Sequence, residues 1–206
     1  IRTWISSMSR IRADRNYLVR RVRDGQVLAR ATANWVYLDS KSMFPTRIDP
    51  AIVAMFSDVE PPALPERSSP RWLCVPERPL QSTVLRDAQY YEADGARHTN
   101  NSVYVEWLEE AVRQTLLAHG FALPLDGPLS LWFHRCSLEY ISAARPGDKV
   151  EISTRLTGRG RSAGRWVQEI RRAGTGERVA QSECITLWRG KGDGVQSWEN
   201  AGRIAE

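Results

Sequence analysis

The residues best suited to chemistry lie in one polar loop, in which Asp94 and His98 are four positions apart. A carboxylate can activate water or attack a carbonyl, and an imidazole can carry a proton because its pKa is closest to neutral. Asn100 and Asn101 follow, where a helix is predicted to begin with unpaired N–H groups and a partial positive charge. This pattern suits a site that polarises a carbonyl or stabilises an oxyanion. The alternative is that Asp94 and the asparagines only cap the helix and that His98 is a surface residue.

The elements predicted around this loop are one long helix and several strands. Apolar residues recur at helical spacing from about 102 to 119, and Gly120 is a natural end. Strands are predicted over residues 83–91, 129–140, 149–156, 165–171 and 178–188, with turns rich in glycine between the later ones. One long helix against antiparallel strands predicts an α+β layer fold.

Proline divides the chain into two regions. Six prolines lie within 61–80, a density that excludes a helix or a central strand and predicts a semi-rigid linker. Residues 1–60, before this linker, begin with β structure that includes a hairpin at the Asp24-Gly25 turn. Residues 81–190 form the second region and carry the polar loop, and residues 191–206 form a C-terminal tail.

The two regions share an internal repeat. The hairpin over 17–35 resembles the hairpin over 166–187 at an offset of 151 residues, with Gly25-Gln26 matching Gly176-Glu177. This offset predicts two copies of one unit, of which the first contributes only its last strands and lacks roughly sixty or more residues at the front of this chain. The alternative is a coincidental similarity of two hairpins.

The composition is that of a globular protein. Its 206 residues are 42% hydrophobic and 26% charged, which excludes a disordered chain, collagen and a coiled coil. No apolar run approaches the ~20 residues of a membrane-spanning helix. The three cysteines, Cys74, Cys136 and Cys184, form no CxxC pair, which argues against a disulfide framework or a structural zinc site and favours a reducing, cytoplasmic environment.

The polar loop and the helix after it resemble a known family. The spacing from Asp94 through His98 to Asn100-Asn101, followed by Tyr104-Val105-Glu106-Trp107, resembles the acyl-ACP thioesterases, whose second hotdog domain carries a D-x-N-x-H-V-N-N loop and a Y-x-x-W helix. Further similarities follow in the family's order, at Trp4-Ile5, Leu18-Val19-Arg20, Ala31–Val36, Arg47–Pro50 and Ser137–Tyr140. Together they cover nearly the whole chain.

The resemblance implies an α+β hotdog fold, an antiparallel sheet wrapped around a long helix, in a double-hotdog arrangement whose first unit is truncated at its N-terminus. It implies hydrolysis of acyl-ACP or acyl-CoA thioesters to a free fatty acid and the carrier thiol in fatty acid biosynthesis. No cofactor and no metal are expected. Asp94 and His98 take the family's catalytic positions, and Asn100 and Asn101 are expected to assist them.

Two departures from the family fall at this site. Ala96 replaces the asparagine between the catalytic residues, and Ser142-Ala143-Ala144 replaces a segment that carries a Glu or a Glu-Cys pair. The alternative function is therefore a non-hydrolytic hotdog protein that binds acyl-pantetheine as a partner in lipid or polyketide synthesis. Cys136 precedes that segment and is either a core residue or a nucleophile.

The basic residues indicate which binding partners the chain could have. Of 29 basic side chains only Lys41, Lys149 and Lys191 are lysine, and arginine suits phosphate recognition, although a GC-rich genome explains the excess equally well. A group of arginines flanks a glycine-rich loop and forms either a solvated hairpin tip or a docking patch for an acidic carrier protein or a pantetheine phosphate: Arg155, Arg159, Arg161 and Arg165. No nucleic-acid-binding motif is present. The oligomeric state stays open, with a homodimer as one option.

Overall fold

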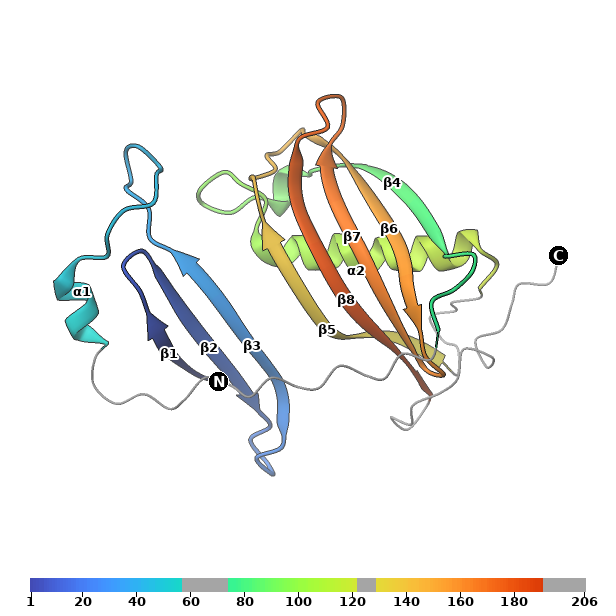
Figure 1. The fold of residues 1–206 in the computed structure, drawn as a ribbon, viewed down its shortest axis with the longest axis horizontal. Helices are drawn as coiled ribbons and strands as arrows, with labels where there is room; N and C mark the ends of the chain where they lie inside the picture. Colours follow the sequence, from blue (N-terminus) through green and yellow to red (C-terminus); the bar gives the residue numbers. More distant parts are fainter. Residues whose placement is uncertain (57–73, 122–128, 191–206) are drawn as a thin grey trace. The chain divides into compact units, whose positions relative to one another are not determined.

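The computed structural model describes residues 1–56, 74–121 and 129–190. The chain divides into two compact units, Ile1–Ser68 and Ser69–Glu206, each with its own antiparallel sheet (Figure 1). The boundary falls inside the predicted linker 61–80, most of which lies outside the described residues. The predicted tail 191–206 lies outside them as well.

The first unit holds a three-stranded sheet in the order β1-β2-β3. Its elements are β1 (Arg2–Met8), β2 (Arg12–Arg20), β3 (Val27–Val36) and the short helix α1 (Pro50–Met55). Asn16 on β2 is fully buried and connects the three strands, because its amide donates to Ser6 Oγ over 2.6 Å and accepts from Thr32 Oγ1 over 2.8 Å. The buried amide is therefore satisfied on both sides.

The second unit is a five-stranded antiparallel sheet with one long helix along a face (Figure 1). The strand order is β4-β6-β7-β8-β5. The elements are β4 (Gln81–Asp87), the 3-10 helix η1 (Tyr90–Glu92), α2 (Asn101–Ala118), β5 (Leu129–Tyr140), β6 (Lys149–Arg159), β7 (Ala163–Arg172) and β8 (Arg178–Gly190). This is the predicted arrangement of an antiparallel sheet around a helix.

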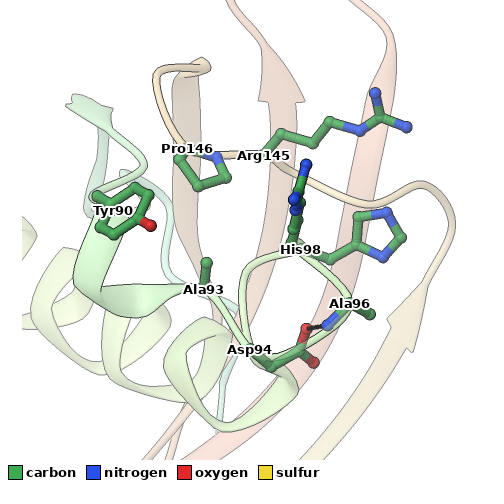
Figure 2. A pocket seen from close by; sticks show the side chains of 8 residues that line it. Tyr90, Ala93, Asp94, Ala96, His98, Arg145 and Pro146 are labelled. Atoms are coloured by element: carbon green, nitrogen blue, oxygen red, sulfur yellow. Dashed lines mark hydrogen bonds between the residues drawn. The ribbon is translucent and has the colours of Figure 1, made fainter.

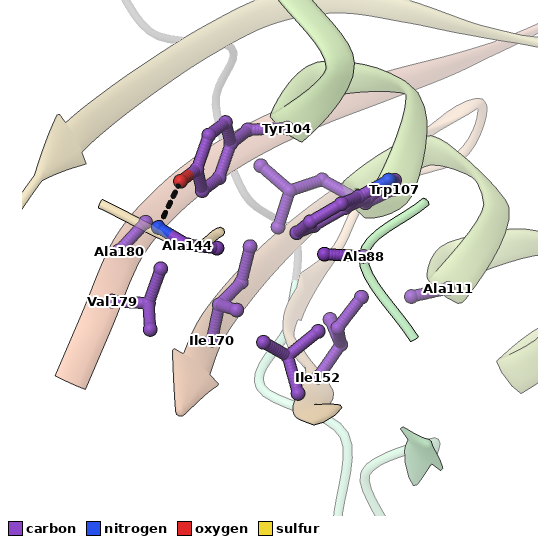
Figure 3. Close-up of a cluster of buried hydrophobic side chains, with 11 residues drawn as sticks. Ala88, Tyr104, Trp107, Ala111, Ala144, Ile152, Ile170, Val179 and Ala180 are labelled. Carbon is purple, nitrogen blue, oxygen red and sulfur yellow. Dashed lines mark hydrogen bonds between the residues drawn. The ribbon is translucent and has the colours of Figure 1, made fainter. Parts of the chain in front are cut away.

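The core of this unit lies between α2 and the sheet. The buried side chains of α2 recur at three- and four-residue spacing, which turns one face of the helix toward the sheet: Tyr104, Trp107, Leu108, Ala111, Val112, Thr115 and Leu116. Figure 3 shows Trp107 and Tyr104 over Ile152, Ile170 and Val179 of the sheet region. Burial of this face fixes the position of the helix and therefore of its first turn.

The strand registers confirm the repeat of 151 residues. The β1–β2 pairing shifts between Ile5 and Ser7, and the β6–β7 pairing shifts between Leu156 and Gly158, which are the same positions after adding 151. A β-bulge is a specific interruption of a ladder. Two bulges at the same repeat position are not explained by a general similarity of hairpins.

The turns of the two copies also agree in detail. Gly25 and Gly176 both have φ +70°, a left-handed conformation that favours glycine. Arg20 Nη1 donates to the Gly25 carbonyl over 2.9 Å, and Arg171 Nη1 donates to the Gly176 carbonyl over 2.7 Å. β1, β2 and β3 therefore repeat β6, β7 and β8.

Two predicted boundaries differ from the structure. The strand predicted over 83–91 ends at Asp87, because the chain turns into η1, where the Glu92 carboxylate accepts the Gln89 N–H over 2.8 Å. The glycine-rich turn predicted between the strands 149–156 and 165–171 is shorter, since β6 continues to Arg159 and β7 begins at Ala163. Local sequence did not reveal either change, because each depends on contacts with neighbouring segments.

Candidate functional site

The loop with Asp94 and His98 is a tight turn closed by its own backbone. The N–H of Asp94 donates to the His98 carbonyl over 2.9 Å, and the N–H of Arg97 donates to the Asp94 carbonyl over 3.0 Å. Arg97 has φ +60°, the left-handed conformation that this closure uses. Asp94 Oδ1 accepts the N–H of Ala96 over 2.9 Å, which orients the carboxylate. The turn therefore holds the carboxylate and the imidazole on one short segment.

Glu92 attaches this loop to the helix. Its carboxylate, 9% exposed, accepts the Trp107 indole N–H over 3.0 Å and an Arg86 guanidinium N–H over 2.6 Å. Its backbone carbonyl accepts the Asn100 N–H over 2.9 Å. Arg86 also lies over the Trp107 ring, 4.3 Å from its centroid. The sequence analysis did not identify Glu92, and its one available signal was a carboxylate among aromatic residues just before the loop.

Asn100 is the N-cap of α2. Its Oδ1 accepts the Ser102 N–H over 3.0 Å and the Ser102 hydroxyl over 2.9 Å. Its carbonyl accepts the Val103 N–H over 3.0 Å. Side-chain capping of this kind satisfies helix N–H groups that have no intrahelical partner. For Asn100 the geometry matches the capping alternative.

Asn101 begins α2 and leaves one donor open. Its carbonyl accepts the Tyr140 hydroxyl over 2.9 Å, which connects the start of α2 to the end of β5. Within the described residues, the N–H of Asn101 donates no hydrogen bond. It therefore stands unpaired at the positive end of the helix, where an anionic oxygen is favoured.

The segment that lacks the family's Glu and Cys faces the loop from the β5–β6 connection. The Ala144 N–H donates to the Tyr104 hydroxyl over 2.9 Å (Figure 3), and the Ala144 carbonyl accepts the Thr99 N–H over 2.8 Å. Burial, opposed by the bond from Ala144, raises the pKa of Tyr104 above its ordinary value. The Ser142-Ala143-Ala144 departure thus lies at the site.

Two cavities meet at the loop. The larger, about 680 Å³, is lined by Tyr90, Ala93, Asp94, Ala96, Arg97, His98, Arg145 and Pro146. The smaller, about 210 Å³, is lined by Asp94, His98, Thr99, Asn101, Tyr104, Tyr140, Ile141, Ser142 and Ala143. Figure 2 shows Arg145 and Pro146 on the segment that faces the loop. Asp94 and His98 line both cavities and Asn101 lines the smaller, whereas Asn100 lines neither.

Thr99 is a further residue that the sequence analysis did not identify. It is 3% exposed and lines the smaller cavity, and its hydroxyl has no hydrogen-bond partner among the described residues. Buried polar groups are nearly always paired. The family's motif has valine at this position, so the hydroxyl is a feature of this chain.

The described residues hold no group of three or more His, Cys, Asp and Glu side chains that could bind a metal ion. In the same ranges no helix is long and apolar enough to cross a bilayer. Cys136 lines neither cavity, so the nucleophile alternative has no support from the geometry. The site offers a carboxylate, an imidazole and one open helix N–H, a set that suits hydrolysis of an activated carbonyl.

Comparisons with known proteins agree with this arrangement. Residues 89–196 match the thioesterase-like superfamily, and residues 1–56 match the acyl-ACP thioesterase N-terminal domain. The oleoyl-acyl carrier protein thioesterase 2 of Arabidopsis thaliana is 27% identical over 124 residues, 57% of this chain and 34% of that protein. The thioesterase 1 of the same plant is 23% identical over 212 residues, 93% of this chain and 55% of that protein. The chain thus spans about half or less of these relatives.

Solved structures show the same fold. A putative oleoyl thioesterase from Lactobacillus plantarum has a TM-score of 0.66 at 18% identity, over 90% of this chain and 66% of that chain. The 12:0-ACP thioesterase from Umbellularia californica has a TM-score of 0.50 at 16% identity, over 57% and 46%. These likenesses confirm the predicted hotdog fold. Because one family model covers more than half of the chain and the other matches its first strands, this chain belongs to the thioesterase-like superfamily and to the acyl-ACP thioesterase family.

Proposed function

We propose that this chain hydrolyses acyl-ACP thioesters, releasing a free fatty acid and the carrier thiol. The observation that carries this proposal is that Asp94 and His98, on one turn, both line the two cavities at the start of α2. The relatives named as acyl carrier protein thioesterases support the same substrate class. Release of the fatty acid would end chain growth in fatty acid biosynthesis, in a reducing cytoplasm.

The thioester carbonyl is bound at the first turn of α2. The Ser102 N–H is held by Asn100 Oδ1 and the Val103 N–H by the Asn100 carbonyl, so the donor left for the carbonyl oxygen is the N–H of Asn101. As the tetrahedral intermediate forms, its negative oxygen gains from this bond and from the positive end of the helix. Asn100 acts through the cap, by keeping this turn in place.

Asp94 is the base. Its Oδ1 is bound to the Ala96 N–H, so the second carboxylate oxygen takes the proton as water attacks the carbonyl carbon. Collapse of the intermediate breaks the carbon–sulfur bond, and the thiolate leaves with its electron pair. His98 supplies the proton that this sulfur takes up. Direct attack by Asp94, with a mixed anhydride hydrolysed in a second step, uses the same geometry.

The guanidinium groups of Arg97 and Arg145 support a substrate that carries phosphate. Both residues line the larger cavity, and neither side chain has a carboxylate partner among the described residues. Guanidinium recognises phosphate through paired N–H donors. Phosphopantetheine carries a phosphate in both acyl-ACP and acyl-CoA, so this feature serves either carrier.

A non-hydrolytic acyl-pantetheine binder is the second candidate. It is favoured by Ala96 and Ala143, which line the cavities at positions where the family's motifs are polar. A thioester tolerates such a reduced set because its thiolate is a good leaving group. This candidate predicts substrate binding without turnover.

The test is thiol release from acyl-ACPs and acyl-CoAs of several chain lengths, with binding followed in parallel by calorimetry. We expect turnover on at least one acyl-ACP, at a higher kcat/KM than on the acyl-CoA of the same chain length. Binding of acyl-ACP without thiol release at any chain length contradicts hydrolysis and favours the second candidate. A higher kcat/KM for acyl-CoA contradicts the choice of carrier alone.

A further inference from the structure

We propose that Cys136 and Cys184 are a site of reversible oxidation, at which a hydroperoxide converts the two thiols into an intramolecular disulfide. The two cysteines are directly opposite each other on the neighbouring strands β5 and β8. Their sulfur atoms are 2.6 Å apart, with the Cys184 thiol donating to Cys136 Sγ. Neither cysteine lines the cavities above, so this site is separate from the proposed hydrolytic one.

The backbone already has the spacing that a disulfide needs. Directly opposite residues on antiparallel strands have Cα atoms about 4.5 to 5.5 Å apart. Disulfides span Cα separations of about 4.4 to 6.8 Å. The cross-link therefore forms without moving either strand.

The two thiols differ in access and acidity. Cys136 is exposed, whereas Cys184 is fully buried. The hydrogen bond from Cys184 lowers the pKa of Cys136, and the same bond, followed by burial, raises the pKa of Cys184. Because the thiolate is the nucleophile, Cys136 is the cysteine that a hydroperoxide meets first.

The reaction then has two steps. The Cys136 thiolate attacks one peroxide oxygen, the O–O bond breaks, and the products are a Cys136 sulfenic acid and hydroxide. The Cys184 sulfur next attacks the sulfenic sulfur, gives up its proton and displaces hydroxide, which leaves as water. The two sulfurs lose two electrons in total and the peroxide gains them, and a dithiol reductant reverses the change.

The cross-link ties an edge strand to the sheet close to the site. β5 is one of the two edge strands of the second sheet, and four residues after Cys136 it reaches Tyr140, whose hydroxyl donates to the Asn101 carbonyl. Negative charge on Cys136 contributes, after burial, to the raised pKa of Tyr140, which reflects how near these groups are. We expect the disulfide to raise the melting temperature by roughly 5 to 10 °C, because it restricts the unfolded chain.

The test treats the whole chain with hydrogen peroxide and counts thiols after denaturation with a maleimide. We expect the count to fall from three to one, the mass to decrease by two hydrogens, and digestion to yield a linked peptide pair containing Cys136 and Cys184. Dithiothreitol should restore all three thiols. This measurement uses the unaltered chain, so it does not depend on how a variant folds.

Three variants separate the roles. Cys74→Ser should still lose two thiols, because Cys74 lies on another segment, where its thiol donates to the Arg159 carbonyl. Cys184→Ser should stop at the Cys136 sulfenic acid, which a cyclic diketone traps, and Cys136→Ser should retain both remaining thiols. Three thiols remaining after peroxide treatment of the unaltered chain, or a linked pair that contains Cys74, would overturn the proposal.

Discussion

The backbone N–H of Asp94 donates a hydrogen bond to the carbonyl of His98 over 2.9 Å, and this one bond closes the turn that carries both side chains. Ala93 and Thr99, on either side, form an antiparallel bridge that extends the closure. The separation of the carboxylate and the imidazole is therefore a local property of the loop. The distance of both groups from α2 depends instead on Glu92, which contacts the helix through Trp107.

Because the loop depends on Glu92 in this way, we expect the contacts of Glu92 to stabilise the fold. Glu92→Gln removes the charge that pairs with Arg86 across 2.6 Å while keeping the size of the side chain. We expect the free energy of unfolding to fall by about 1 to 3 kcal/mol, less than for a fully buried pair because Arg86 is 26% exposed. Urea denaturation measures it. Glu110→Gln, whose carboxylate accepts an exposed Gln114 amide, is the matched control and should change little. Equal losses in the two variants contradict the role of Glu92.

Thr99 supplies a prediction of the opposite sign. Its buried hydroxyl has no partner among the described residues, so Thr99→Val removes an unsatisfied polar group at nearly constant volume. We expect the free energy of unfolding to rise by about 1 kcal/mol in a urea titration. Thr115→Val is the control, because the Thr115 hydroxyl donates to the Ala111 carbonyl over 2.8 Å. Removing this hydroxyl should lower the free energy of unfolding by about 1 kcal/mol. If Thr99→Val lowers the free energy of unfolding as much as Thr115→Val does, the Thr99 hydroxyl is paired and the prediction is wrong.

Arg145 tests recognition of a phosphate. Arg145 lines the larger cavity, and its backbone N–H binds Asp148, so Arg145→Ala removes the charge and leaves the loop anchored. With the turnover proposed above, we expect KM for a pantetheine thioester to rise about 5- to 10-fold with kcat unchanged, as for loss of about 1 kcal/mol of binding. The rise should shrink at high salt. Arg161→Ala, an exposed arginine on the β6–β7 turn, is the control, and an equal KM change in both variants contradicts a specific role.

Tyr104 predicts a loss of stability at high pH. Burial raises its pKa above the ordinary value of 10.0, so the folded state holds the phenol proton more tightly than the unfolded state does. This contribution to stability is complete below about pH 10 and is lost as the pH rises from there through the folded-state pKa. Tyr104→Phe should flatten the alkaline decline in melting temperature, although it also loses the bond from Ala144. Tyr90→Phe, at an exposed position, should leave the decline unchanged.

Much of the fold could be predicted from the sequence, because local residue patterns determine the helix, the strands and the turns. The α2 periodicity, the β5 bounds and the repeat between Gly25 and Gly176 are written in short segments, and the register shifts agree with the repeat. The polar loop was also readable, since its turn is closed by residues within the loop itself.

The rest depended on contacts between distant segments. The Glu92–Trp107 bond joins residues 15 apart, and the Thr99–Ala144 backbone bond joins segments separated by α2 and β5. Asn100 looked equivalent to Asn101 in sequence, yet one is the helix cap and the other lines a cavity. No periodicity or motif distinguishes these roles, because they arise from how α2 packs on the sheet.

In the proposed reaction, the Asp94 carboxylate is the base or nucleophile for thioester hydrolysis. The most direct measurement is kcat for thiol release from acyl-ACP by the unaltered chain and by Asp94→Asn, with melting temperatures compared. The asparagine variant keeps the side-chain oxygen that accepts the Ala96 N–H, so the fold should be preserved. We predict that kcat falls by about 10²- to 10⁴-fold at an unchanged melting temperature. Equal kcat values for the two proteins would contradict the claim.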